Sequence, residues 1–308
     1  MAFSSKERRI KQLIMENLFE KLAPSYTFEI FPPKGNKSTD GTYAVIDSLV
    51  SFNPDLISVT YGAGGSSRDN TVEIASGIQN KYNVCGVAHL TCVGTTRENI
   101  REILNRLKSN GVRNILALRG DLKDESDLGE FHHASELISF IKNEFGNDFD
   151  VFAACYPEKH PEAKSVEEDL IHLKEKSDLG VKGFISQLFF DNDIFCEWRE
   201  KARAMGVTQP IIAGIMPITS ASQIEKVVEM CGASVPERVR RFVKAYGHHQ
   251  GAVKEAGIAY ATEQIIDLLA RDVEGIHLYT MNQADTVRRI DAGIRSVLYT
   301  KRYAIRSN

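Results

Sequence analysis

Short apolar runs recur along the chain, and a longer amphipathic stretch follows each of them. Each run has the length of one buried β-strand, and the stretches between runs repeat their apolar residues near the helical period of 3.6. Residues 97–109, for example, place Ile100, Ile103, Leu104 and Leu107 on one helical face. The runs are Tyr26–Phe31, Leu56–Thr60, Cys85–Leu90, Asn114–Leu118, Val151–Cys155, Gly183–Phe189, Ile211–Ile215 and Gly275–Tyr279.

Strands that alternate with helices predict a parallel sheet. The count of eight favours a closed (β/α)8 TIM-type barrel over an open doubly wound sheet, which has fewer strands. No low-complexity tract or Pro/Gly/Ser linker divides the chain, so we expect residues 1–308 to form a single domain. An N-terminal helical extension is predicted by the helical spacing of Ile10, Leu13, Ile14, Leu18 and Leu22.

The longest interval between predicted strands separates Ile215 from Gly275. It carries three helical patterns, over residues 221–231, 236–246 and 251–270. Because this insertion follows the carboxyl end of a strand, it can form a cap over a bound substrate. A last helix, Ala284–Leu298, is expected to close the barrel.

The composition is typical of a folded, water-soluble protein. Hydrophobic residues make up 43% and charged residues 26% of the chain, which argues against disordered, collagen-like and disulfide-scaffold classes. The formal net charge of −3 argues against nucleic acid as a partner, because phosphate binding depends on an excess of positive charge.

Targeting signals and cysteine usage indicate a cytoplasmic protein. The chain has no apolar stretch of about 20 residues and no signal-peptide pattern, so we expect neither a membrane span nor secretion. Its five cysteines are scattered and odd in number, which is typical of reduced thiols rather than of a disulfide frame.

Polar residues follow nearly every predicted strand at its carboxyl end, where barrels of this kind build their sites. A single polar residue in such a place is more often a loop hydrogen bonder than a catalyst, but the recurrence favours a functional mouth. These residues are Glu29, Thr60, Tyr61, His89, Arg119, Gly120, Asp121, Tyr156, His160, Gln187, Pro217 and Tyr279.

Glu29 is the most informative of these residues, because it interrupts the apolar run of Phe28, Ile30 and Phe31. We expect it to face the barrel mouth among low-polarity neighbours, which disfavour the charged carboxylate and keep the acid protonated near neutrality. A general acid needs that state. The alternative is a buried ion pair with Arg119 or a lysine, which would keep Glu29 ionised.

Two loops have features that are typical of phosphate-binding sites. The glycine-rich segment Gly62–Ser67 follows a strand and opens a helix, but it lacks the dinucleotide fingerprint and is better explained as a tight turn. Arg119, Gly120 and Asp121 combine a guanidinium that can bind phosphate with a carboxylate. The alternative for these three residues is a salt-bridged turn.

Metal binding is not expected. Cys85, His89 and Cys92 lie along one predicted strand, where odd and even positions face opposite sides, so their side chains cannot converge. The His132–His133 and His248–His249 pairs are most simply explained as solvated surface histidines. The chain contains no His-Glu-x-x-His, P-loop or Gly-x-Ser-x-Gly motif.

Taken together, seven segments in order resemble the successive motifs of the methylenetetrahydrofolate reductases. They cover nearly the whole chain, and their shared order makes the resemblance specific. The segments are Phe28–Lys34, Ser58–Ser66, Ala88–Cys92, Leu116–Asp121, Tyr156–Ala163, Gln187–Asp191 and Gly214–Pro217.

This resemblance implies a barrel with non-covalent FAD at its mouth, reduced by NADH or NADPH and reoxidised by 5,10-methylenetetrahydrofolate at the same flavin face in a ping-pong scheme. Glu29 resembles the acid that protonates folate N10, and Asp121 resembles the carboxylate that stabilises the resulting iminium cation. The residues that resemble flavin-contacting positions are Thr60, His89, Arg119, Gly120, Asp121, Tyr156, His160, Asp169 and Lys176. Those that resemble substrate-facing positions are Gln187, Gln223 and Tyr279.

The chain departs from the family pattern at two positions, with Val227 in place of a stacking phenylalanine and Gln283 in place of an arginine near the folate tail. Because the sequence stops at Asn308, we expect no eukaryotic-type regulatory domain and no inhibition by S-adenosylmethionine. Two alternatives stay open: another FAD barrel resembling proline dehydrogenase, and a non-catalytic subunit that binds folate or a partner. A homo-oligomer or a redox partner subunit is compatible with the sequence.

Overall fold

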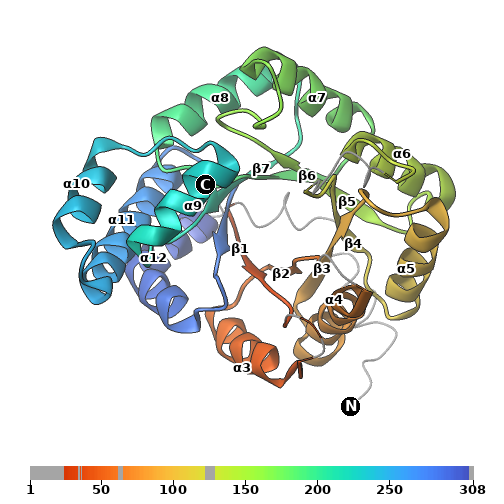
Figure 1. The fold of residues 1–308 in the computed structure, drawn as a ribbon, viewed down its shortest axis with the longest axis horizontal. Coiled ribbons are helices and arrows are strands. Elements are labelled where there is room, and N and C mark those ends of the chain that lie inside the picture. The colour runs from red at the N-terminus through yellow and green to blue at the C-terminus, as the bar shows by residue number, and fades with distance from the viewer. Residues whose placement is uncertain (1–23, 34, 36, 62–64, 122–128, 305–308) are drawn as a thin grey trace.

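Eight parallel strands close into a barrel in the computed structural model, which describes residues 24–33, 35, 37–61, 65–121 and 129–304. Each strand pairs with the next along the chain, and the last pairs with the first, so the sheet has no free edge. Helices surround the strands as an outer ring (Figure 1). The predicted (β/α)8 barrel is therefore confirmed.

The strands follow the predicted apolar runs closely. They are β1 (Ser25–Ile30), β2 (Leu56–Val59), β3 (Cys85–Thr91), β4 (Asn114–Leu118), β5 (Asp150–Cys155), β6 (Gly183–Ser186), β7 (Ile211–Ile215) and β8 (Gly275–Tyr279). The largest difference is at β6, which was expected to continue to Phe189. There the side chain of Gln187 accepts a hydrogen bond from the backbone N–H of Leu188 at 2.9 Å, and the chain leaves the sheet.

The predicted helices are also present. The first half of the described chain carries α3 (Asp40–Leu49), α4 (Gly65–Gly77), α5 (Arg97–Ser109), α6 (Ala134–Phe145) and α7 (Val166–Asp178), with short η1 (Val50–Phe52) and η2 (Ile78–Tyr82). The second half carries α8 (Asn192–Ala204), α9 (Ala221–Cys231), α10 (Glu237–Tyr246), α11 (Gln250–Ala270) and α12 (Ala284–Ala304). The predicted N-terminal helix lies outside the described residues, as do Gly62–Gly64. Of the helices that the structure describes, none is both long enough and apolar enough to traverse a bilayer.

Alternation along the strands divides the side chains between two cores. Outward residues such as Phe28, Ile30 and Val59 belong to the large cluster between the sheet and the helices. Inward residues of β2 to β7 form a smaller apolar cluster inside the barrel, made of Leu56, Cys85, Val87, Leu116, Phe152, Ile185 and Ile212. Cys92 lies in the outer cluster and Cys85 in the inner one, so the two thiols diverge as the alternation predicts.

Helix α11 approaches the loop after β7 so closely that only glycine fits at position 257. A Cβ atom there would lie 1.9 Å from the carbonyl oxygen of Ile218. The carbonyl belongs to the backbone and cannot rotate away, unlike the end of a flexible side chain. Gly257 therefore allows the insertion between β7 and β8 to pack against the mouth of the barrel.

We expect Gly257→Ala to lower the free energy of unfolding by ~1–3 kcal/mol, as overpacked sites do. The clash outweighs the gain of up to ~1 kcal/mol that alanine brings in a helix. Gly41→Ala in α3 is the matched control, because no atom lies within 4 Å of its added Cβ. Urea denaturation of both variants measures the difference, and equal stabilities would contradict the close packing.

Candidate active site at the barrel mouth

Glu29 lies at the carboxyl end of β1 with only 7% of its surface exposed. Its carboxylate oxygen Oε2 is 3.6 Å from Nε2 of His89 on β3 and 3.9 Å from Nε2 of His277 on β8. The predicted inward position is confirmed. The neighbours are more polar than expected, because inward positions of β3 and β8 also carry polar side chains, and the expected alternative partner Arg119 pairs elsewhere.

Burial controls the charge of His89. It lowers the pKa of the imidazole from 6.5 to about 4, and the nearby Glu29 offsets only part of this effect. Nε2 of His89 has no hydrogen-bond partner among the described residues. The mouth therefore holds a neutral imidazole beside a carboxyl group, which is an arrangement able to exchange a proton with a bound molecule.

The corner after β8 fixes the backbone of Glu29. The hydroxyl of Thr280 donates to the Glu29 carbonyl at 2.6 Å. The side chain of Asn282 bonds both the N–H and the carbonyl of Phe31, each at 2.9 Å. Met281 and Asn282 adopt left-handed backbone angles, with φ of 50° and 55°, which turn the chain sharply enough to make these contacts.

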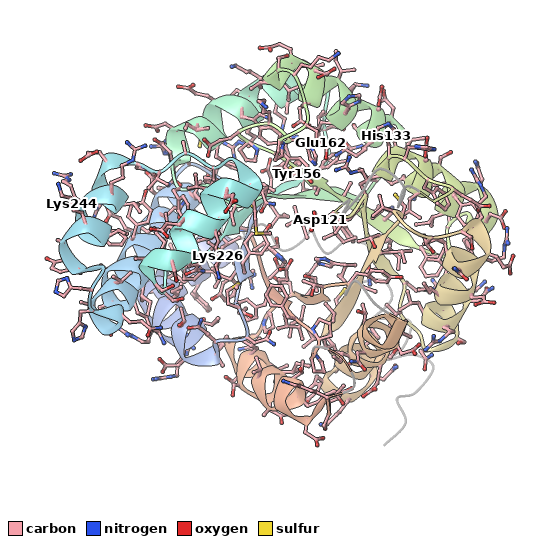
Figure 2. All side chains as sticks on the ribbon, viewed as in Figure 1. Asp121, His133, Tyr156, Glu162, Lys226 and Lys244 are labelled. Carbon is pink, nitrogen blue, oxygen red and sulfur yellow. The ribbon has the colours of Figure 1, made fainter. Side chains whose placement is uncertain are left out.

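Arg119 lies on the opposite side of the mouth, after β4. Its guanidinium donates to both carboxylate oxygens of Glu162, each at 2.5 Å, and not to Asp121 as a salt-bridged turn would require. Gly120 has a φ of +91°, and an added Cβ would lie 2.9 Å from Val93. Asp121 is exposed. Figure 2 shows Asp121, Tyr156 and Glu162 near one another at the rim.

A second polar group of residues forms where β5 meets α7. The rings of Tyr156 and His160 are 4.8 Å apart and nearly perpendicular. Asp169 accepts a hydrogen bond from the backbone of His160, and burial raises the pKa of its carboxyl. Lys176 donates to the Ala154 carbonyl at 2.6 Å, and burial lowers the pKa of its ammonium.

The side chains of the other predicted residues differ in their exposure and in their hydrogen bonds. Thr60 directly follows β2 and is half-buried. The hydroxyl of Tyr279 donates to the Ser186 carbonyl at 2.7 Å, and burial raises its pKa, so the phenol stays neutral. The side-chain oxygen of Gln187 accepts a hydrogen bond from the backbone N–H of Leu188. Gln223 lies in the first turn of α9, and its side chain bonds the preceding loop at Thr219, at 2.8 Å, and at Pro217, at 3.3 Å.

The two positions that depart from the family pattern are Val227, which lies on α9, and Gln283, which lies just before α12. Val227 is partly buried against the apolar cluster of α9 and α10. Gln283 precedes α12, and its side-chain oxygen accepts from the Thr286 hydroxyl at 3.3 Å. Neither residue supplies the ring or the charge that the family pattern has there.

Sequence analysis missed three residues around this mouth: Glu162, His277 and Asn282. The alternation of β8 was a usable signal for His277, since it lies two residues before Tyr279 and so shares its inward face. No pattern in the chain marks Glu162 as the partner of Arg119, because the two residues are 43 positions apart.

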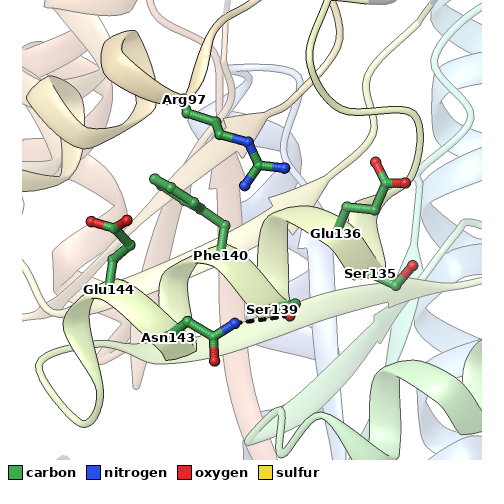
Figure 3. A pocket seen from close by; sticks show the side chains of 7 residues that line it. All are labelled: Arg97, Ser135, Glu136, Ser139, Phe140, Asn143 and Glu144. Atoms are coloured by element: carbon green, nitrogen blue, oxygen red, sulfur yellow. Dashed lines mark hydrogen bonds between the residues drawn. The ribbon is translucent and has the colours of Figure 1, made fainter.

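An open cavity of about 510 Å³ lies away from the mouth, between α5 and α6 (Figure 3). Arg97, Phe140 and Glu144 line it, and the Arg97 guanidinium lies over the Phe140 ring at 5.6 Å. Two acidic side chains, Glu136 and Glu144, and one basic side chain, Arg97, line this cavity, and it contains none of the strand-end residues. We therefore place the candidate active site at the mouth rather than here.

Comparison with known proteins identifies the family. A family model described as methylenetetrahydrofolate reductase matches residues 14–294. The chain belongs to the methylenetetrahydrofolate reductase family. The family resemblance that the motifs indicated is thereby confirmed, and Glu29, Arg119 and Asp121 all lie within the matched span.

Relatives within the methylenetetrahydrofolate reductase family include plant and bacterial proteins. Methylenetetrahydrofolate reductase (NADH) 1 of Arabidopsis thaliana is 35% identical over 282 residues, which are 87% of this chain and 48% of the plant protein. The 5,10-methylenetetrahydrofolate reductase of Escherichia coli is 35% identical over 259 residues, covering 84% of this chain and 86% of the bacterial one. The chain thus spans about half the length of the plant relative.

Solved structures share the fold of this methylenetetrahydrofolate reductase family member. An uncharacterized Clostridium thermocellum protein that binds two copies of 5-methyl-5,6,7,8-tetrahydrofolic acid matches with a TM-score of 0.65 and 13% identity, over 93% of this chain and 99% of its own. A dihydropteroate synthase from Coxiella burnetii, in complex with pteroic acid, matches with a TM-score of 0.51 and 12% identity, over 92% and 94%. At these identities the likeness is one of fold.

We expect the buried His89 to make stability pH-dependent. Its folded pKa of about 4 lies below the 6.5 of an exposed imidazole, so the unfolded chain binds the proton first as the pH falls. Stability is lost progressively between pH 6.5 and 4, by up to about 3 kcal/mol. Urea denaturation at several pH values should show a smaller loss in His89→Asn than in the parent. The exposed His248→Asn variant is the control, and parallel curves for all three proteins would contradict the burial.

Proposed function

We propose that this chain catalyses the flavin-dependent reduction of 5,10-methylenetetrahydrofolate to 5-methyltetrahydrofolate, with a nicotinamide as electron donor. The observation that carries the proposal is Glu29, a buried carboxyl group at the mouth of a barrel that belongs to this family. Nicotinamide and folate use the same flavin face in turn. Residues 1–308 act as one catalytic domain in the cytoplasm.

The residues of the β4–β5 side suit a bound FAD. Arg119 already holds an anion, the Glu162 carboxylate, whose side chain is 59% exposed and can give way to a phosphate group. The Arg119 Nε atom and the His89 Nε2 atom are buried without partners among the described residues, so each has hydrogen-bonding capacity left for a ligand.

The set that would hold FAD is Thr60, His89, Arg119, Gly120, Asp121, Tyr156, His160, Asp169 and Lys176. Asp169 and Lys176 lie beneath the rim, where both are largely buried and each influences the pKa of the other. Gly120 can contribute only its backbone, because a Cβ there would lie 2.9 Å from Val93. Bound FAD supplies the hydride chemistry, accepting from the nicotinamide and donating to the folate.

Glu29 and Asp121 have different roles in the chemistry that the protein itself supplies. Glu29, in its buried position, donates a proton to N10 of the folate so that the five-membered ring opens to an iminium cation. Asp121 is exposed at the rim, and its negative charge stabilises that cation. The two carboxyl groups are thus assigned different roles by their different burial.

Gln187, Gln223 and Tyr279 are proposed to face the substrate. The Tyr279 phenol and the Gln187 amide both lie at strand ends on the β6–β8 side. Gln223 must exchange its loop hydrogen bonds to Thr219 and Pro217 for contacts with a substrate. The names of the plant relatives specify NADH, and we propose NADH as the donor for this chain, with NADPH as the comparison.

We expect Arg119→Ala to weaken FAD binding by about tenfold to a hundredfold, since a hydrogen bond to a charged group contributes ~1.5–3 kcal/mol. The matched control is Arg101→Ala, which removes an arginine that pairs with Glu144 through two bonds of 3.1 Å on the outer wall. Fluorescence titration of the apoprotein with FAD measures both affinities. An unchanged affinity in Arg119→Ala would remove this residue from the cofactor site, and a parent protein that binds no FAD would contradict the proposed function.

We expect Glu29→Gln to separate the two half-reactions. The transfer of hydride from NADH to FAD needs no proton from Glu29 and should stay within about tenfold of the parent. Folate reduction should fall by the ~10²–10⁴ typical of a lost general acid. Stopped-flow traces of flavin absorbance record each step separately.

The exposed carboxyl of Glu144 provides the control variant Glu144→Gln, which should leave both steps unchanged. If Glu29 were a structural carboxylate, both half-reactions would decline together, along with thermal stability. Equal losses in the two traces would therefore exclude Glu29 as the acid.

A further inference from the structure

His277 is a buried imidazole for which the proposed chemistry has so far no use. It lies on β8 with 0% exposure, and its Nε2 atom has no hydrogen-bond partner among the described residues. The carboxylate oxygen Oε2 of Glu29 lies 3.9 Å from that atom. An unpartnered polar atom in such a place costs free energy, so its orientation toward Glu29 requires an explanation.

The other ring nitrogen of His277 is fixed by Thr27. Its Nδ1 atom is 2.7 Å from the Thr27 hydroxyl oxygen, and the same oxygen is 3.2 Å from the carbonyl oxygen of Ile276. A carbonyl can only accept, so the single hydroxyl proton goes to Ile276. Thr27 is then free to accept from His277, and the arrangement that satisfies both contacts has the proton on Nδ1.

The Nδ1–H tautomer leaves a lone pair on Nε2, directed at Glu29. A lone pair repels an ionised carboxylate but accepts a hydrogen bond from a protonated one. We propose that Thr27 and His277 are positioning residues that keep the acid proton on Glu29. Thr27 holds the tautomer, and the Nε2 lone pair of His277, 3.9 Å from the Glu29 Oε2 atom, disfavours the ionised carboxylate. This inference rests on the proposed role of Glu29 as the proton donor to folate.

The other groups around Glu29 do not oppose this arrangement. His89 on β3 stays neutral near neutrality because burial lowers its pKa to about 4. Tyr279, the β8 residue in register with Glu29, is a neutral phenol, and the β2 residue in register is Ser58. Within the described part of the chain, no lysine or arginine forms an ion pair with Glu29.

The tautomer can be measured without any catalytic assay. Histidine labelled with ¹⁵N reports which ring nitrogen carries the proton, and His277→Gln identifies the signal among the eight histidines of the chain. We expect the Nδ1–H form at neutral pH in the parent and in Thr27→Ser, which keeps the hydroxyl. In Thr27→Val, which keeps the shape and removes the hydroxyl, the Nε2–H form should gain population. A parent signal from the Nε2–H form would overturn the inference.

The protonation of Glu29 can be measured separately by infrared spectroscopy. The infrared band of a protonated carboxyl, identified by its loss in Glu29→Gln, should be present at neutral pH in the parent and in Thr27→Ser. It should be weaker in Thr27→Val. An equally strong band in Thr27→Val would overturn the coupling between the hydroxyl and Glu29, whatever the activity of the protein.

The pH dependence of folate reduction tests whether Thr27 and His277 influence turnover. In Thr27→Val, the pH at which single-turnover folate reduction falls by half should move down by about one unit, while flavin reduction by NADH stays within about threefold of the parent. Thr27→Ser should restore the parental profile. A purely structural role would slow both steps without moving the profile. If the parent reduces no folate, the proposed function fails, and the tautomer and infrared results still decide the inference.

Discussion

The pairing of β1 with β8 is the constraint on which the rest of the mouth depends. It closes the barrel, and its register sets Thr27 beside His277 and Glu29 beside Tyr279. Because successive residues of a strand face opposite sides, a slip of one residue would turn Glu29 outward into the apolar layer against the helices. That layer, which holds Phe28 and Ile30 without exposed surface, penalises such a slip strongly. The hydrophobic core outside the barrel thus specifies the position of the acid inside it.

The interior of the barrel is divided by polarity. Inward side chains of β2 to β7, such as Phe152, Ile185 and Ile212, form an apolar cluster. Those of β1 and β8 are hydroxyls, a carboxyl and an imidazole. Burying polar groups without partners costs stability, and two of their atoms, Ser25 Oγ and His277 Nε2, lack partners among the described residues. The proposed proton donor lies at this polar seam.

The β4–β5 side of the mouth carries charged side chains of both signs. Arg119 and Glu162 pair through two bonds at the rim, while Lys176 and Asp169 lie beneath them with pKa values shifted by burial. Exposed pairs of this kind contribute little to stability. The proposed role of Arg119, binding an anionic ligand in place of Glu162, leaves Asp121 exposed beside the pair.

The sequence by itself determined the fold class and most of the mouth. The eight apolar runs became the eight strands, because parallel strands covered by helices are largely apolar. Glu29 interrupts such a run and lies on the face opposite to Phe28 and Ile30, as the alternation of a strand predicts. Only the tertiary structure decided the partners. The neighbours of Glu29 are His89 and His277, and the partner of Arg119 is Glu162 rather than Asp121. Local patterns report which face a side chain takes, whereas contacts between distant strands depend on the register and curvature of the closed sheet, which no local pattern contains.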